Sequence, residues 1–304
     1  MDVYLPIANL SVNGLFIVLL GGLTGMLSGM FGVGGGFLTT PLLIFYGVPP
    51  TVAAASASTQ VTGASVTGVL AHSKRRGVDY HMGLIIVAGG LLGTGVGALL
   101  FRFFQSIGQI DVIISALYVV MLGTIGAMMA REALQALRGG AEGDGRTAPR
   151  RRHHPLVTAL PLRRRFYRSG LYISLLAPLI LGFLVGILTM LMGVGGGFIL
   201  VPAMLYILGM SAGVVVGTSL FNILFVTIAS TLMHSLTTKA VDIILVAFLL
   251  IGSVTGVQIG SQLALKAKPE LLRLILAVIV LLVAFRMLFG LGFQPDEIFT
   301  VQPL

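Results

Sequence analysis

Apolar residues fall into ten segments along the chain, separated by short polar or glycine-rich stretches. They lie at about 12–30, 37–46, 51–71, 82–104 and 110–131, and again at about 171–192, 197–208, 213–235, 241–265 and 271–289. The long segments hold roughly 20 residues, enough for a helix that rises about 1.5 Å per residue to cross a hydrocarbon layer of about 30 Å. The segments 37–46 and 197–208 are too short to cross alone. The pattern therefore predicts an all-α polytopic membrane protein with two short half-helices.

The two runs of apolar segments repeat one another. The core GVGGGF occurs at residues 32–37 and again at 193–198, each time with a proline four residues after the phenylalanine. With small shifts in register, Gln60 then aligns with Asn222 and Asp79 with Asp242. Matched polar positions in the same order indicate an internal duplication, which is common in transporters. We therefore predict a transmembrane repeat over 1–138, a basic linker over 139–169 and a second transmembrane repeat over 170–304.

Composition and charge agree with a membrane protein. Hydrophobic residues make up 56% of the chain, charged residues only 10%, and the mean hydropathy is +1.03, whereas soluble domains have about 25% charged residues. The net charge is +9, and eight of the fifteen arginines lie between residues 146 and 168. This placement is typical of a cytoplasmic loop that obeys the positive-inside rule, rather than of a nucleic-acid-binding patch. The N-terminus lacks a basic region and a small-residue cleavage site, so the first apolar segment is expected to remain as a span.

The remaining basic residues distinguish two arrangements of the repeats. If each repeat crosses the membrane an odd number of times, the repeats are inverted. Lys266, Lys268 and Arg273 then share the side of the linker, and only Arg102 and Lys239 lie opposite among the loop charges. Parallel repeats would place the first three outside, which fits the charge rule less well. The charges therefore favour inverted repeats, each with a Gly-rich broken helix followed by a short half-helix.

The duplicated glycine core has the properties of a small-anion site. Four glycines within five residues disfavour a helix, since each costs about 1 kcal/mol relative to alanine, and a break in lipid must be buried or line a wet cavity. The half-helix that follows would begin with unpaired N–H groups carrying about half a positive charge. Glycine lets a ligand approach those groups closely, and no Lys-Ser or Lys-Thr follows as in a nucleotide-binding loop. The glycines predicted to surround the anion are Gly34, Gly35, Gly36, Gly195, Gly196 and Gly197.

The next long segment of each repeat carries hydroxyl and amide side chains. A single hydroxyl in a membrane helix more often bonds helix to helix, at about 0.6 kcal/mol each. Gln60 and Asn222 are the better candidates, because amides are rarer in apolar spans and can donate to the oxygens of an anion. The side chains predicted to bind substrate are Ser56, Thr59, Gln60, Thr218, Ser219 and Asn222.

Other repeated positions favour structural roles. Two glycine rows, Gly89–Gly97 and Gly252–Gly260, place a glycine at every fourth residue and so favour close helix packing. That packing could lie within or between protomers, which leaves a homodimer open. Asp79 and Asp242 are expected to cap helix starts.

Several kinds of site are not expected. The chain has no cysteine, and its five histidines have no carboxylate cluster beside them, so neither a disulfide nor a metal site is predicted. No nucleophile–base pair suggests an enzyme, and no cofactor is expected. His72 and His234 fit either an interfacial position or a proton-coupling role.

Several motifs together resemble one family. They are GMFGVGGGFLTTPLL at 29–43, GVGGGFILVPAML at 193–205, GTS at 217–219 and the Val-Asp pairs at 78–79 and 241–242. On these motifs the chain resembles the sulfite exporter TauE/SafE family over roughly 12–132 and 171–289. The resemblance implies a bacterial inner-membrane transporter of sulfite or of organosulfonates such as sulfoacetate. The first repeat departs from the second, because Ala55-Ser56-Ala57 stands where the second has Gly217-Thr218-Ser219.

The resemblance and the glycine segments together predict a secondary transporter that works by alternating access. The expected partners are a small anionic substrate and the lipid bilayer, not nucleic acid. Two alternatives stay open, namely a transporter of another small anion and a membrane scaffold or assembly protein without a substrate path.

Overall fold

The structure is a computed structural model that describes residues 2–74, 77–138, 163–166, 171–263 and 269–292. The first half contains β1 (Asp2–Leu5), β2 (Leu10–Asn13), α1 (Gly14–Phe31), α2 (Gly36–Phe45), α3 (Pro50–Lys74), α4 (Tyr80–Ser106) and α5 (Ile110–Arg138). The second contains β3 (Arg163–Phe166), β4 (Leu171–Ser174), α7 (Leu176–Met192), α8 (Gly197–Tyr206), α9 (Ala212–Met233), the π-helix η1 (His234–Thr238), α10 (Ile243–Leu263) and α11 (Pro269–Gly292). Six helical segments of this described part are long and apolar enough to cross a membrane.

The expectation of an all-α chain is wrong at two hairpins. β1 pairs with β2 and β3 with β4, both antiparallel. Each strand of the second hairpin begins 161 residues after the corresponding strand of the first. Residues 12–13 and 171–174 are strands here, not the starts of apolar spans as predicted, because strands of four residues are too short to show a period beside a long apolar run. β3 lies inside the range assigned to the basic linker, and the rest of that linker lies outside the described residues.

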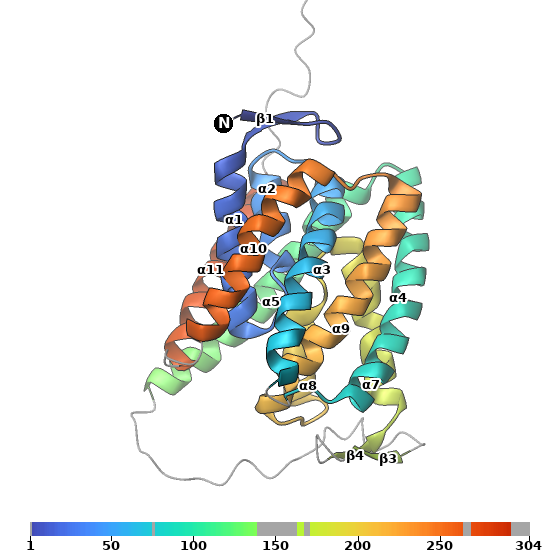
Figure 1. The fold of residues 1–304 in the computed structure, drawn as a ribbon, viewed down its shortest axis with the longest axis vertical. Helices are drawn as coiled ribbons and strands as arrows, with labels where there is room; N and C mark the ends of the chain where they lie inside the picture. The colour runs from blue at the N-terminus through green and yellow to red at the C-terminus, as the bar shows by residue number, and fades with distance from the viewer. Residues whose placement is uncertain (1, 75–76, 139–162, 167–170, 264–268, 293–304) are drawn as a thin grey trace, which may run out of the picture.

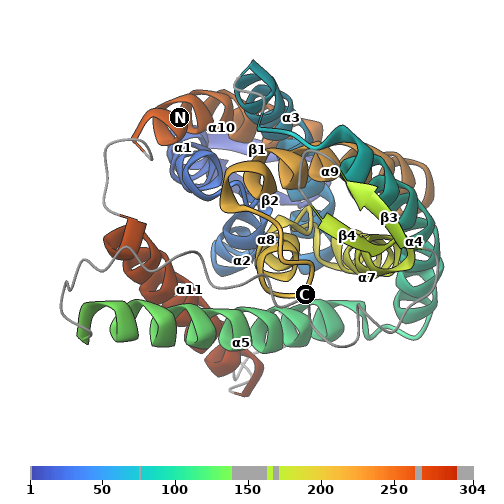
Figure 2. The same ribbon diagram turned by 90° about the horizontal axis from the view of Figure 1, so that it is seen from below.

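Helix contacts follow the same duplication. α1 packs along α10, and its counterpart α7 packs along α4; α3 packs on α9, and α5 on α11. Of these four contacts, the first two are equivalents of each other, and the last two each join a helix to its own counterpart. Figure 2 shows α5 and α11 crossing each other along one side of the molecule.

The glycine rows make the closest of these contacts possible. A Cβ atom at Gly89 would lie 2.1 Å from the carbonyl oxygen of Leu179 on α7, and one at Gly252 would lie 2.0 Å from that of Val18 on α1. Side chains at these positions would separate the helices, so the expectation of close packing is confirmed. The contact lies within one chain.

The chain reverses direction at each glycine segment. One buried cluster joins Ile17 near the start of α1, Leu43 near the end of α2 and Val52 near the start of α3 to the β1–β2 hairpin. Because both ends of the α1–α2 pair lie in this cluster, α2 returns toward the end of the bundle from which α1 came. The equivalent cluster in the second repeat contains Ile173, Leu208 and other residues of β4, α7 and α8. Figure 1 shows the two hairpins at opposite ends of the bundle.

Two aspartates cap equivalent helices, as expected. The Oδ1 atom of Asp79 accepts hydrogen bonds from the backbone N–H groups of His81 and Met82, both at 3.1 Å. The Oδ1 atom of Asp242 likewise accepts from the N–H groups two and three residues ahead, at 3.1 and 3.2 Å. Both side chains are buried, so each capping bond satisfies donors that water does not reach.

Candidate functional site

The two glycine segments use left-handed backbone at equivalent positions. The φ angles are 67° at Gly32 and 73° at Gly34, and 72° at Gly193 and 78° at Gly195. Glycine adopts this region without a steric penalty, whereas other residues are strained there. Gly32 and Gly193 end α1 and α7, and α2 and α8 begin at the last glycine of each segment.

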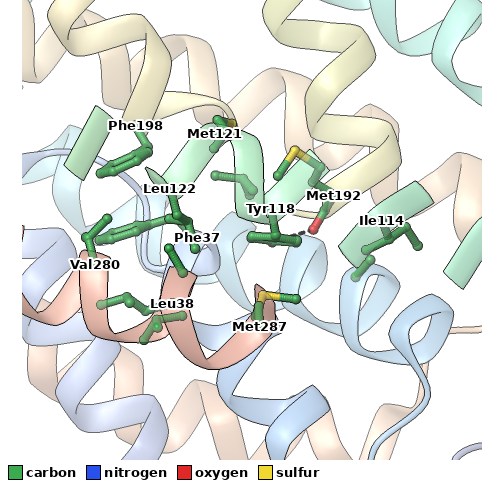
Figure 3. Packing of buried hydrophobic residues seen from close by; sticks show 14 of the residues in the cluster. Phe37, Leu38, Ile114, Tyr118, Met121, Leu122, Met192, Phe198, Val280 and Met287 are labelled. Atoms are coloured by element: carbon green, nitrogen blue, oxygen red, sulfur yellow. Dashed lines mark hydrogen bonds between the residues drawn. The ribbon is translucent and has the colours of Figure 1, made fainter. Parts of the chain in front are cut away.

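The two segments touch each other in the middle of the molecule. A Cβ atom at Gly36 would lie 2.5 Å from the carbonyl oxygen of Gly193, and one at Gly197 would lie 2.3 Å from that of Val33. The residues that follow, Phe37 and Phe198, stack their rings with centroids 4.6 Å apart and planes 7° from parallel (Figure 3). In this conformation the direct contact between the segments leaves no room there for an anion.

Backbone N–H groups at both segments have no hydrogen-bond partner. Across the described part of the chain, none of the hydrogen bonds uses the N–H groups of residues 33–37 or 194–198. These groups lie at the N-terminal ends of α2 and α8, where the helix dipole is positive. Both helices therefore point unpaired donors toward the centre of the bundle.

The paired amides are buried and equally unpartnered. Gln60 on α3 and Asn222 on α9 are fully buried, and neither the oxygen nor the nitrogen of either side-chain amide has a hydrogen-bond partner. Each precedes a residue that packs on the glycines, since Val61 and Ile223 both approach the Cβ position of Gly195, at 2.7 and 3.0 Å. Because buried amides are almost always hydrogen-bonded in proteins, two such amides at equivalent positions call for an explanation.

The predicted hydroxyl donors are placed differently, because most are used inside the protein. The Oγ atom of Ser56 accepts from the backbone N–H of Asp242 at 3.1 Å, and Oγ1 of Thr218 accepts from that of Asp79 at 2.9 Å. Ser219 donates to the carbonyl of the glycine that ends α1, at 2.9 Å. Thr59 donates to a carbonyl of its own helix at 3.2 Å. Among the predicted side chains, the two amides alone have no partner.

Tyr118 on α5 is a polar contact of the glycine segments that the sequence analysis did not name. Its hydroxyl donates to the carbonyl oxygen of Met192 at 2.7 Å (Figure 3), and the carbonyl oxygen of Gly36 lies 3.4 Å from the same hydroxyl. It thus ties α5 to the end of α7 and to the start of α2. A single tyrosine within a long apolar segment carries no signal that could have identified this role.

The two histidines occupy different environments. His234 is fully buried, its Nε2 atom lies 3.0 Å from the carbonyl oxygen of Met190, and its ring packs edge-on against Phe101. His72 is only half-buried and its Nδ1 atom lies 3.0 Å from the carbonyl of Gly68. No three metal-ligating side chains gather anywhere in the described ranges.

A cavity of about 460 Å³ lies beside the glycine segments. Val33 and Phe198 line it at one end, and Tyr206 and Glu132 at the other. α8 lines this cavity along its whole length, and α5 lines part of its wall as well. None of the residues predicted to bind the anion lines it.

The chain is similar in sequence to known proteins. The sequence profile of the family described as "Sulfite exporter TauE/SafE" matches residues 17–287. The chain belongs to the sulfite exporter TauE/SafE family. The matched range contains both glycine segments, both amides and all the helices that position them, and the resemblance seen in the motifs is thereby confirmed.

Relatives from distant organisms carry similar names. The chain is 31% identical over 278 residues to the "Probable membrane transporter protein YjnA" of Bacillus subtilis, covering 90% of this chain and 98% of the relative. It is 30% identical over 268 residues to a "Probable membrane transporter protein" of Xylella fastidiosa, covering 87% and 90%. An archaeal relative, the "Probable membrane transporter protein MJ0441" of Methanocaldococcus jannaschii, is 23% identical over 278 residues, covering 87% and 91%. No solved structure gives a significant match.

The protein is therefore a multi-pass membrane transporter of the TauE/SafE family, not an enzyme.

Proposed function

We propose that this protein is a secondary transporter that moves a small sulfur-containing anion, sulfite or an organosulfonate such as sulfoacetate, across the bacterial inner membrane by alternating access. The observation that carries the proposal is the pair of buried, unpartnered amides of Gln60 and Asn222. A buried amide without a partner costs about 1–3 kcal/mol, so a site that keeps two of them has a use for them when a ligand is bound.

The chemistry of the donors fits an oxyanion. The backbone N–H groups of residues 33–37 and 194–198 have no partner within the described chain, and side-chain amide NH₂ groups add further donors. Sulfite and sulfonates present acceptor oxygens to such donors, and the positive ends of two helices favour their charge. The site needs no formal cation, which keeps release of the anion possible.

The arrangement of the elements supports inverted repeats. The starts of α3 and α10 lie in the buried cluster with the β1–β2 hairpin, whereas the starts of α4 and α9 lie with β4. Three helices of each repeat therefore cross in alternating directions, and the α1–α2 and α7–α8 pairs each return to the side they left. An odd number of crossings inverts the second repeat.

The charges then assign the two sides. Lys74 at the end of α3 belongs to the end of the bundle that holds β3 and β4, as do the three arginines of β3. Arg102 and Lys239 belong to the opposite end. By the positive-inside rule the first end faces the cytoplasm.

Alternating access requires the glycine segments to separate. In the present conformation Gly36 and Gly197 are in contact with the opposite segment, and Oδ1 of Asn222 lies 3.4 Å from the Cβ position of Gly90 on α4. An anion can therefore bind between the glycine segments and the amides only when the two repeats move apart on one side. We infer that the anion then takes the place between Gln60, Asn222 and the bare N–H groups, and that rocking of the repeats exposes it to the other side.

The test is uptake of labelled sulfite and sulfoacetate by proteoliposomes. The double variant Gln60→Leu with Asn222→Leu should abolish uptake, because it removes all four unpartnered amide atoms. Gln258→Leu is the matched control, since Gln258 is an exposed amide on α10, and it should leave uptake unchanged. Uptake of a small anion without sulfur in place of sulfite and of every organosulfonate offered, or no uptake by the wild type of any anion offered, would contradict the proposal.

A further inference from the structure

The 460 Å³ cavity has the size of an organic molecule rather than of an inorganic anion. A water molecule occupies about 30 Å³ in the liquid, so the cavity corresponds to about 15 water volumes. Sulfite, with four heavy atoms, would fill only a small part of it. Cavities of about 300–1,000 Å³ are typical sites for small organic ligands.

The walls of the cavity are almost entirely apolar. They come from α1, α5, α8, α9 and α11 and include the methionines Met30, Met128 and Met129. Methionine side chains are flexible and adapt to ligands of varied shape. Such walls bind the hydrocarbon part of a ligand and give nothing to a charged group.

The two ends of the cavity differ in charge. At the inner end lie Val33 and Phe198, whose backbone N–H groups belong to the unpartnered set at the starts of α2 and α8. At the outer end the hydroxyl of Tyr206, the last residue of α8, donates to Oε2 of Glu132 at 2.8 Å. A carboxylate at one end and positive helix ends at the other would orient an anion with its charged group inward. With ten residues, α8 separates the ends by about 15 Å.

We propose that this cavity holds the hydrocarbon body of the substrate, and that the protein therefore selects organosulfonates with an apolar chain of several carbons over sulfite. The inference rests on the proposed function, because it assumes that the sulfonate group reaches the glycine segments. It adds a second part to the site, in which α8 and the methionines of α5 contact the hydrocarbon part of the substrate.

The experiment measures the affinity of the purified protein in nanodiscs for sulfite and for the n-alkanesulfonates from methanesulfonate to pentanesulfonate. Each buried methylene should improve Kd about fourfold, equivalent to about 0.8 kcal/mol. From one to five carbons the gain should be on the order of 100-fold. Pentanol, which has the same chain without the charge, should bind far more weakly.

One substitution places the effect in the cavity. Ala203 lies on α8 and lines it, so Ala203→Phe should abolish the dependence on chain length while the affinity for sulfite stays as in the wild type. Ala116→Phe adds the same ring to an exposed position of α5 away from the cavity, and it should retain the dependence. If Ala203→Phe does not fold, Met129→Trp fills the same cavity from α5.

The outcomes separate the two proposals. A flat series in a protein that still transports sulfite overturns the inference and leaves the proposed function intact. Dependence on chain length that survives in folded Ala203→Phe or Met129→Trp overturns the assignment to this cavity, and equal binding of pentanol overturns the choice of an anion. Failure of every sulfonate and of sulfite in the transport assay refutes the proposed function itself.

Discussion

Removing the unpartnered amides should make the protein more stable and inactive at the same time. Asn222→Leu keeps the branched outline of the side chain but replaces the amide oxygen and nitrogen with methyl groups. Gln60→Met keeps the length of the other side chain but removes its amide oxygen and nitrogen. Both amides are fully buried without a hydrogen-bond partner, so each substitution removes a desolvation penalty of about 1–3 kcal/mol and adds buried apolar surface.

The assay is thermal unfolding of the purified variants with and without sulfoacetate. In domains of 150–250 residues, 1 kcal/mol shifts Tm by about 2–4 °C, so each variant should unfold several degrees above the wild type in the absence of ligand. A ligand at 100 times its Kd stabilises by about 2.7 kcal/mol, and this gain should appear in the wild type but in neither amide variant. The exposed Gln258→Leu control should change neither value.

One result would refute the reasoning. If Asn222→Leu and Gln60→Met both unfold below the wild type without ligand, then the amides make hydrogen bonds in the protein that stabilise it, and their buried state needs no ligand to explain it.

Three further substitutions test the packing around the site. Gly197→Ala should prevent folding or destabilise strongly, because its Cβ would lie 2.3 Å from the carbonyl oxygen of Val33. Gly95→Ala is the control and should be neutral or slightly stabilising, because no atom lies within 4 Å of its Cβ position. The measurements are Tm and the yield of monodisperse protein in detergent. Asp242→Ala should cost about 1 kcal/mol through loss of the helix cap, measured as a lower Tm, and an unchanged Tm would contradict the capping role. Tyr118→Phe should cost about 1 kcal/mol by removing the hydroxyl that donates to the end of α7, and a Tm equal to that of the wild type would show that this bond contributes nothing.

The short helices could be predicted from sequence, but their direction could not. The apolar segments 37–46 and 197–208 correspond closely to α2 (Gly36–Phe45) and α8 (Gly197–Tyr206). Whether a half-helix continues the preceding helix or turns back depends on distant contacts, such as the shared burial of Leu43 and Ile17. No local pattern encodes that choice, because both directions bury the same apolar face.

The candidate site, too, is predictable from the sequence only in part. Gln60 and Asn222 stood out because amides are rare in apolar spans, and the structure places both where they have no partner. Ser56 and Thr218 are also predicted from the sequence to bind the anion, yet their hydroxyls accept from the backbone N–H groups of the capping aspartates, Asp242 and Asp79. The donor that occupies each hydroxyl lies more than 100 residues away along the chain, so only the folded structure reveals that these groups are already engaged.

The contacts of α3 with α9 and of α5 with α11 join helices to their own counterparts. A surface that recognises its own copy needs only one gene, because a single repeat could pair with a second molecule of itself. Fusion through the arginine-rich segment would then have joined the two copies into one polypeptide, in which their sequences could diverge. Gln60 in one copy and Asn222 in the other are an example of such divergence at a buried position.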